Sequence, residues 1–214
     1  MRKVTGILAI FLLVLSAGLQ AQVALSRKSF QELAASRGLV ILHVNWGRYW
    51  KCGAFENAQL QRLTFRRIAG DGTGTADADW ELSPASVLLA KSSFQPYTVY
   101  LEPGRYALGG FRFKVTRSAA DIQVAEPGPA ELIVDGKPVA GSFTVAPGET
   151  VYVGHFGVDC DGEPTPWRFY IDGRAAFEEY VAGFRKQFPF MQEVPVTFRL
   201  FETSTLGNPY ELPK

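Results

Sequence analysis

Short segments rich in β-branched and aromatic residues follow one another along this chain, and Pro, Gly, Asn and Asp residues separate them. Such spacing is typical of an antiparallel sandwich or barrel. The expected strands cover residues 39–46, 60–68, 97–101, 132–134, 142–145, 150–156, 167–171 and 195–201. We therefore predict a mainly β fold, an antiparallel β-sandwich, in which the uninterrupted apolar run 39–46 is buried on both faces.

Two helices are expected beside the strands. A short N-terminal helix is predicted over 26–36, where Ser29 and Glu32 have the spacing of a capping box. A C-terminal helix is predicted over about 172–188, with Asp172 as its cap and apolar residues at helical spacing. We treat residues 22–214 as a single β-sandwich domain with this helical insertion.

The apolar phase changes once within the segment 104–115. Tyr106 and Leu108 occupy even positions, whereas Phe111, Phe113 and Val115 occupy odd ones. A regular strand has a period of two, so this change would turn half of these side chains into water. One inserted residue restores the pattern, and glycine tolerates that position best. We predict a β-bulge at Gly109-Gly110.

The stretch YLEPGRYALGGF, residues 100–111, has a counterpart in VAPGETVYVGHF, residues 145–156. The pattern apolar-x-Pro-Gly-x-Tyr of 101–106 resembles the strand entry of transthyretin-like and carboxypeptidase-regulatory-like sandwich domains. The second stretch, with the 172–188 helix and Arg199-Leu200-Phe201, resembles a group of uncharacterised exported bacterial envelope proteins. These resemblances imply a β-sandwich and an exported location. They bring no catalytic residue, because the matching residues form turns.

The N-terminus has the three parts of a secretory signal peptide. Arg2 and Lys3 precede an uncharged apolar run from Val4 to Leu19, and small and polar residues follow. The run is shorter than the ~20 residues of a spanning helix. We expect residues 1–21 to be removed, leaving a periplasmic or secreted protein without a membrane span. The alternative is an uncleaved anchor.

The charge balance argues against a nucleic-acid partner. Removing Arg2 and Lys3 from the 22 basic residues leaves the chain nearly balanced against its 21 acidic residues. A nucleic-acid-binding domain normally carries a clustered excess of Lys and Arg. No phosphate-cradling glycine loop precedes a predicted helix, so we also expect no cofactor.

Cys52 and Cys160 are the only cysteines. An even cysteine count in an exported chain favours a disulfide. The bridge would close a loop of about 108 residues, worth up to about 4.7 kcal/mol in the loop-entropy model. The alternatives are two buried thiols or metal ligation.

His43 and His155 are the only histidines, and each lies in a predicted strand that runs toward a cysteine. If the cysteines are bonded, the two strands lie close together, and a metal-dependent hydrolase using both imidazoles with Asp159 or Asp161 becomes conceivable. The simpler interpretation is that each histidine is a structural residue of the sheet. No carboxylate spacing around either histidine matches a metal motif.

Trp46, Tyr49 and Trp50 form an aromatic cluster just past the end of a predicted strand, with Arg48 between them. Residues of these types dominate recognition surfaces, so the cluster predicts a platform for sugar rings or for another envelope protein. The alternative is a core plug beside the disulfide.

Other catalytic patterns are weak. Ser83 and Ser86 lack the glycine frame of a nucleophile elbow, and Glu178-Glu179 do not face each other across a site. The acidic stretches 71–79 and 159–163 resemble calcium loops without a full ligand set. The leading hypothesis is an exported envelope protein of structural or partner-binding type, without catalytic activity. The alternatives are a carbohydrate-binding module or the His43–His155 hydrolase.

Overall fold

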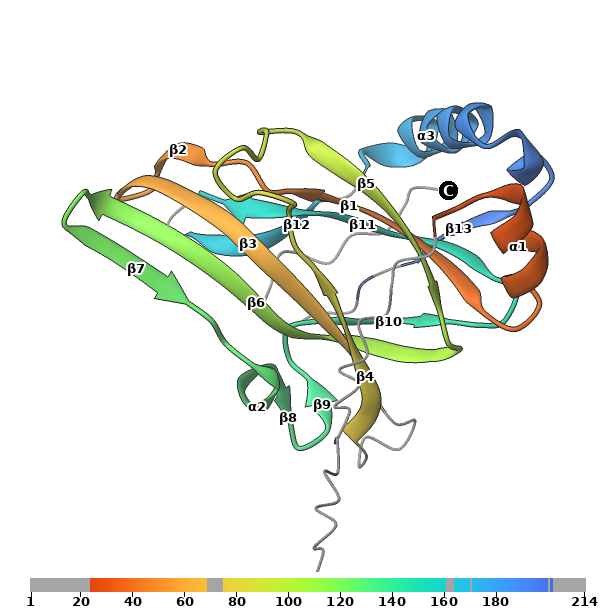
Figure 1. Ribbon diagram of the computed structural model, residues 1–214, viewed down its shortest axis with the longest axis horizontal. Coiled ribbons are helices and arrows are strands. Elements are labelled where there is room, and N and C mark those ends of the chain that lie inside the picture. The colour runs from red at the N-terminus through yellow and green to blue at the C-terminus, as the bar shows by residue number, and fades with distance from the viewer. Residues whose placement is uncertain (1–23, 69–74, 161–163, 170, 200, 202–214) are drawn as a thin grey trace, which may run out of the picture.

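A computed structural model of the chain describes residues 24–68, 75–160, 164–169, 171–199 and 201. The fold is mainly β, as predicted, with two large sheets and a small hairpin (Figure 1). The predicted signal segment 1–21, Asp161 and the end of the chain beyond Phe201 lie outside the described residues. Within the described ranges, no helix is both long enough and apolar enough to cross a bilayer.

Sheet A has the strand order β12-β11-β1-β5, and β13 also pairs with β11. Its strands are β1 (Gly38–Asn45), β5 (Phe94–Leu101), β11 (Thr150–Asp159), β12 (Thr165–Phe169) and β13 (Val196–Phe198). The prediction of an antiparallel fold needs a correction here, because β11 pairs in parallel with both β1 and β13. Strands buried on both faces, as β1 and β11 are, suit parallel pairing between covering layers.

Sheet B is antiparallel and is built on the long pair β3–β6. Strands β2 and β4 flank β3, whereas β7 and β10 flank β6. Its strands are β2 (Tyr49–Cys52), β3 (Phe55–Ile68), β4 (Thr75–Leu82), β6 (Gly104–Ser118), β7 (Asp121–Ala125) and β10 (Ser142–Val145). Residues 75–79, expected in a loop, therefore belong to a strand, because β3 extends far enough to pair with them.

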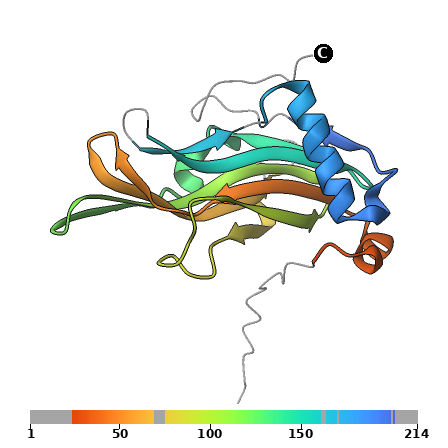
Figure 2. The same ribbon diagram turned by 90° about the horizontal axis from the view of Figure 1, so that it is seen from above.

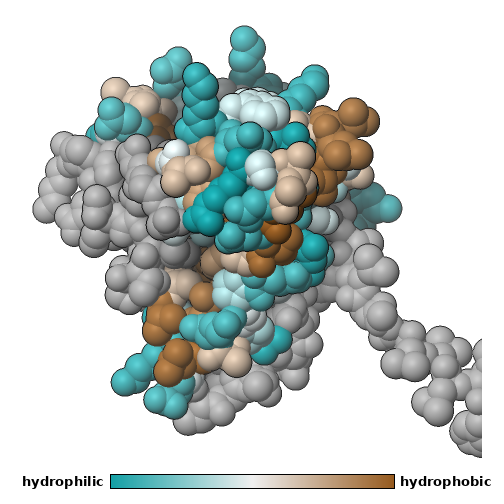
Figure 3. Space-filling view, turned by 90° about the vertical axis from the view of Figure 1, so that its left-hand side faces the viewer, coloured by the Kyte–Doolittle hydropathy of each residue, from teal (hydrophilic) through white to brown (hydrophobic). Residues whose placement is uncertain are grey.

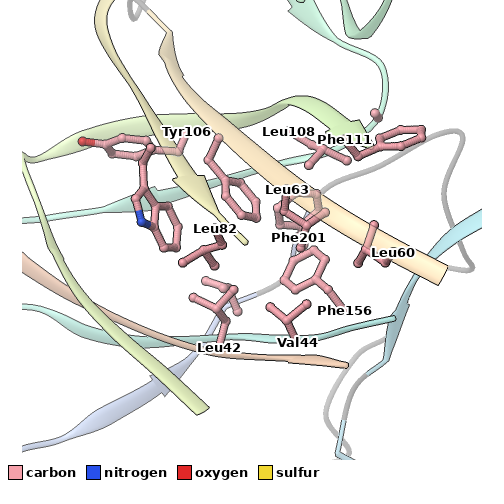
Figure 4. Close-up of a cluster of buried hydrophobic side chains, with 14 of the residues drawn as sticks. Leu42, Val44, Leu60, Leu63, Leu82, Tyr106, Leu108, Phe111, Phe156 and Phe201 are labelled. Carbon is pink, nitrogen blue, oxygen red and sulfur yellow. The ribbon is translucent and has the colours of Figure 1, made fainter. Parts of the chain in front are cut away.

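The main hydrophobic core receives side chains from both sheets. Leu42 and Val44 of β1 and Phe156 of β11 meet Leu60 and Leu63 of β3 in one buried cluster (Figure 4). The Phe65 ring of sheet B lies edge-on to that of Phe156 in sheet A, with 5.6 Å between ring centroids. The two sheets thus bury their facing surfaces against each other.

A second cluster covers the opposite face of sheet A. Helix α3 (Gly173–Gln187) lies across this face (Figure 2) and buries Phe177, Val181 and Phe184 against Leu39, Ile41 and Tyr152. Leu33 and Phe30 of helix α1 (Arg27–Leu33) pack at the edge of the same cluster. The N-cap of α1 is Ser26, whose side chain exchanges hydrogen bonds with Ser29, so the expected Ser29–Glu32 box is wrong. The capping box begins three residues earlier than expected, because the Ser26 side chain accepts a hydrogen bond from the Ser29 backbone N–H.

The segment between β7 and β10 contains a short helix and a hairpin. Helix α2 (Pro129–Leu132) leads into β8 (Ile133–Val134), which pairs with β9 (Lys137–Pro138). Asp135 and Gly136 have φ values of 49° and 71°, as a two-residue hairpin turn requires. The strand expected at 132–134 is therefore shortened, while the Asp-Gly turn is confirmed.

The predicted disulfide joins Cys52 and Cys160, with 4.6 Å between their Cα atoms. Cys52 belongs to β2 of sheet B, and Cys160 directly follows β11 of sheet A. The bond therefore ties the two sheets together at one end of the molecule.

The bulge predicted at Gly109-Gly110 is present. Thr64 of β3 pairs with Gly110, but its neighbour Phe65 pairs with Leu108, so Gly109 is the inserted residue. A Cβ on Gly109 would lie 2.9 Å from the Cβ of Arg66, which is rigidly attached to the backbone. At Gly110 the nearest atoms would be at ordinary contact distances of 3.5 Å.

The substitution Gly109→Ala should destabilise the protein by about 1–3 kcal/mol, because the new methyl overpacks against β3. The matched Gly110→Ala substitution should change the free energy of unfolding by less than about 1 kcal/mol. Urea unfolding of both variants checks this. Equal losses at both positions would contradict the assignment of Gly109 as the bulged residue.

The double substitution Cys52→Ala/Cys160→Ala should lower the free energy of unfolding by about 2–5 kcal/mol, because the closed loop is long. Denaturant unfolding with and without dithiothreitol measures the effect. The variant should be insensitive to reductant, whereas the wild-type protein should approach the variant once reduced. A wild-type protein whose stability ignores reductant would show that the bond contributes nothing.

Candidate functional site: a pocket beneath helix α3

A second bulge, in β11, places His155 on the outer face of sheet A. Ile41 of β1 pairs with Tyr152, but His43 pairs with His155, so β11 carries one extra residue between these pairs. Gly154 lies in this interval and has a φ of 111°, a conformation that favours glycine. Because of the extra residue, Tyr152 and His155, three positions apart, both reach the face covered by α3.

The two imidazole rings stack directly on each other. Their centroids are 4.3 Å apart and their planes differ by 8°. Phe94 of the edge strand β5 stacks with the His155 ring at 4.8 Å. Three flat rings from three different strands therefore pack together on the outer face of sheet A.

Helix α3 supplies the polar partner of this stack. The Tyr180 hydroxyl oxygen lies 3.2 Å from His43 Nε2, within hydrogen-bonding distance. The same tyrosine ring contacts His43 edge-on, with 5.4 Å between the ring centroids. For His155, no hydrogen-bond partner of Nε2 is found among the described residues.

A pocket of about 360 Å³ opens beside the His43–Tyr180 pair. Strands β1 and β5 form its floor and helix α3 forms its wall. The lining is mostly apolar, and its polar groups come from His43, Thr98, Tyr180 and Gln187. The apolar lining is contributed by Ile41, Pro96, Gly183, Phe184 and Phe188.

Burial changes the titration of all three polar rings. It lowers the pKa of His43 to about 4, because the charged imidazolium loses its hydration. The pKa of His155 is lowered to about 3, mainly by burial and to a smaller extent by the neighbouring His43. Burial raises the pKa of Tyr180. Both histidines and the tyrosine are therefore neutral at pH 7.

This arrangement is poorly suited to the hydrolase expected as an alternative. A lone pair of an imidazole nitrogen lies in the ring plane, so the lone pairs of two parallel stacked rings do not converge on one ion about 2.0–2.1 Å from each nitrogen. Among the described residues, no group of three or more His, Cys, Asp and Glu side chains could hold a metal ion. As a general base at pH 7, an imidazole with a pKa near 4 is weak.

The structure separates the three aromatic residues expected to form a platform. Trp46 is completely buried in the main core, and its indole N–H donates a hydrogen bond to the Tyr97 hydroxyl at 2.7 Å. Tyr49 is half-buried and accepts a hydrogen bond from the Asn45 side-chain amide. Trp50 alone of the three is exposed, at 67%. They do not form one flat surface for a sugar ring.

The remaining candidate residues are not brought together. Asp159 ends β11, four residues beyond His155, and Asp161 lies outside the described residues. Glu178 and Glu179 are exposed on α3. Ser83 and Ser86 belong to the segment between β4 and β5.

Tyr180 and the pocket were not expected from the sequence. The bulge that turns His155 toward α3 could have been predicted from the sequence. Val151 and Val153 occupy odd positions in this strand, whereas Phe156 and Val158 occupy even ones. This is the same change of phase that predicted the bulge at Gly109-Gly110. No such signal marks Tyr180, because in sequence it resembles any residue on the apolar face of an amphipathic helix.

Comparisons with protein-family models, with curated proteins and with solved structures found no match to this chain. The resemblance to transthyretin-like and carboxypeptidase-regulatory-like domains therefore stays a prediction.

Stability should fall on acidification because both histidines bind protons in the unfolded chain, near pH 6.5, before they do so in the folded protein. The two histidines contribute fully to the free energy of unfolding above pH 6.5. This contribution is lost as the pH falls toward their pKa values in the folded protein, about 4 for His43 and about 3 for His155. Each histidine accounts for at most about 1.4 kcal/mol per pH unit in this window. The variant His155→Phe retains a ring that can stack on His43. In this variant the part of the slope of unfolding free energy against pH that comes from the histidines should be about halved.

Urea unfolding at intervals between pH 7.5 and pH 4 measures both slopes. Above pH 7 the variant and wild type should differ little, since the replaced imidazole is neutral there. Parallel stability profiles for the two proteins would contradict the burial of a neutral His155.

Proposed function

We propose that this protein is an exported, disulfide-linked β-sandwich of the cell envelope, and that it acts by binding a small ligand in the pocket beneath α3. The observation that carries the proposal is the pocket itself, with the His43–Tyr180 pair at its side. Its volume of about 360 Å³ falls within the range of about 300–1,000 Å³ typical of small-molecule sites.

Two features support the envelope and sandwich parts of the proposal. A disulfide between distant positions is compatible with an oxidising compartment outside the cytoplasm. Two sheets that share one buried core fit the layers of a sandwich, although β1 and β11 run parallel. Export through the 1–21 segment remains the corresponding expectation from the sequence.

The lining favours a compact, largely apolar ligand with one hydrogen-bonding group. Ile41, Phe184 and Phe188 offer apolar contacts, and the neutral His43–Tyr180 pair offers a donor and an acceptor. A charged ligand would lose its hydration here without a countercharge. The neutral, hydrogen-bonded histidine therefore supports a binding role rather than acid–base catalysis.

A pair of isosteric probes tests the polar contact. 4-Ethylphenol should bind about fivefold more tightly than 4-ethyltoluene, because only the phenol can hydrogen-bond to the His43–Tyr180 pair. In the double variant His43→Phe/Tyr180→Phe, which removes both partners of the phenol, this preference should shrink toward unity. Ligand-observed NMR titration measures both affinities, and equal binding of the two probes to the wild-type protein would count against the proposal.

Gly183 provides a test of the pocket's place. It lines the pocket, and a Cβ at this position would meet no atom within 4 Å. Gly183→Leu should fill part of the pocket and lower probe affinity at least about tenfold. Gly183→Ala should leave probe affinity unchanged and stabilise α3 by up to about 1 kcal/mol. Probe binding that survives Gly183→Leu would place the ligand elsewhere, and turnover of glycan, ester or peptide substrates would argue against a binding-only role.

A further inference from the structure

Large hydrophobic side chains are exposed at the end of sheet B that carries β2 and β7. Leu88 and Leu89 are 85% and 82% exposed, and Trp50 is 67% exposed. Ile122 and Val124 of β7 are also exposed. Figure 3 views this end of the molecule and shows brown hydrophobic side chains standing out among teal hydrophilic ones. We call these five residues the β2–β7 patch.

The strand register places Trp50 and the β7 residues on one face. Trp50 pairs with Asn57, Asn57 with Thr116, and Thr116 with Ile122. Directly paired residues point to the same side of a sheet, so this row runs along the outer face of sheet B. Three strand spacings separate its ends, about 14 Å. Val124, two residues after Ile122, points the same way.

Gln59 holds the loop that bears the two leucines on this face. Its side-chain amide donates to the carbonyl of Trp46 at 2.9 Å and to that of Val87 at 2.8 Å. Gln59 is itself buried, so the anchor is shielded from water. Because Val87 immediately precedes them, Leu88 and Leu89 project from a fixed point beside the Trp50 row.

The other side of the loop is anchored beside Trp50. The Ser92 hydroxyl donates to the Arg48 carbonyl at 3.3 Å, and the Ser92 backbone packs closely on Gly47. The Arg48 guanidinium in turn lies over the Trp50 ring, 5.4 Å from its centroid. The loop that bears the two leucines is thus hydrogen-bonded, through Ser92, to the segment that carries Arg48 and Trp50.

Four basic residues lie next to the patch in the chain or in the sheet. Arg48, Lys51 and Lys91 flank Trp50 and the leucines in the chain, and Lys114 pairs with Val124. In the part of the chain that the structure describes, none of these four cations has an ion pair. Farther along the same face, by contrast, Arg62 and Arg112 both pair with Glu126. The unneutralised cations lie next to the exposed apolar groups.

We propose that the β2–β7 patch docks the protein on a phospholipid bilayer that carries anionic headgroups. Projecting leucines can enter the acyl boundary of a bilayer, and an exposed tryptophan suits the interface between headgroups and chains. Adjacent Lys and Arg side chains then meet the anionic headgroups. A bilayer needs no preformed complementary surface, which fits side chains that project from a loop instead of lining a groove.

Vesicle co-sedimentation tests the proposal. The protein should bind vesicles of phosphatidylcholine with phosphatidylglycerol more tightly than vesicles of phosphatidylcholine alone, and salt should weaken the binding. The double substitution Leu88→Ser/Leu89→Ser should lower the partition coefficient at least about tenfold. The matched control is Val134→Ser, an exposed apolar residue of the separate β8–β9 hairpin, which should bind as wild type does.

Two further variants separate the contributions of Lys114 and Trp50 to membrane binding. Lys114→Gln should weaken binding to the anionic vesicles about fivefold and leave binding to neutral vesicles unchanged. Trp50 fluorescence should shift to shorter wavelength on anionic vesicles, and the shift should be absent in Trp50→Phe. All chains are compared with the same termini, so any contribution of residues 1–21 is common to them.

The proposal is overturned if no vesicle is bound, or if the Leu88/Leu89 variant binds as well as the wild type. Sedimentation velocity in the absence of lipid adds a second criterion. Self-association that the leucine substitutions abolish, without lipid binding, would overturn it in favour of a second copy of this chain as the occupant.

Discussion

Strands β1 and β11 lie side by side in the middle of sheet A and are buried on both faces. Each side chain must therefore pack either against sheet B or against the helices on the other face. A strand can satisfy this demand only while its period of two stays in phase with its neighbours. Gly154 resets that phase in β11 by adding one residue, so Val151 and Phe156 both reach the core although their spacing is odd.

The candidate site is a consequence of this reset. Without the extra residue, His155 would not share a face with His43, and the two rings would not stack. The burial that makes the sheet stable also keeps both imidazoles neutral. A neutral histidine hydrogen-bonded to Tyr180 is a poor general base at pH 7 but a good element of a mostly apolar pocket. Packing and pocket chemistry therefore have the same origin.

The two proposed binding surfaces lie on opposite layers of the molecule. The pocket is on the outer face of sheet A, under α3, and the β2–β7 patch is on the outer face of sheet B. The Cys52–Cys160 bond joins the layers next to the patch, since Cys52 is two residues from Trp50. Docking through one layer would leave the pocket on the other layer open to its ligand.

The residue pattern alone determined several local features: the positions of most of the predicted strands, the helix that begins after Asp172, the Asp135-Gly136 turn and the bulge at Gly109-Gly110. These follow from periodicity and backbone preference, which act over a few neighbouring residues. The parity of the cysteines pointed to their bond. Only the tertiary structure decided the parallel pairing of β1 with β11, the Tyr180 contact with His43, and which of Trp46 and Trp50 faces water. Those outcomes depend on neighbours more than a hundred residues away or on a different sheet, and local periodicity carries no information about which distant segment will cover a given side chain.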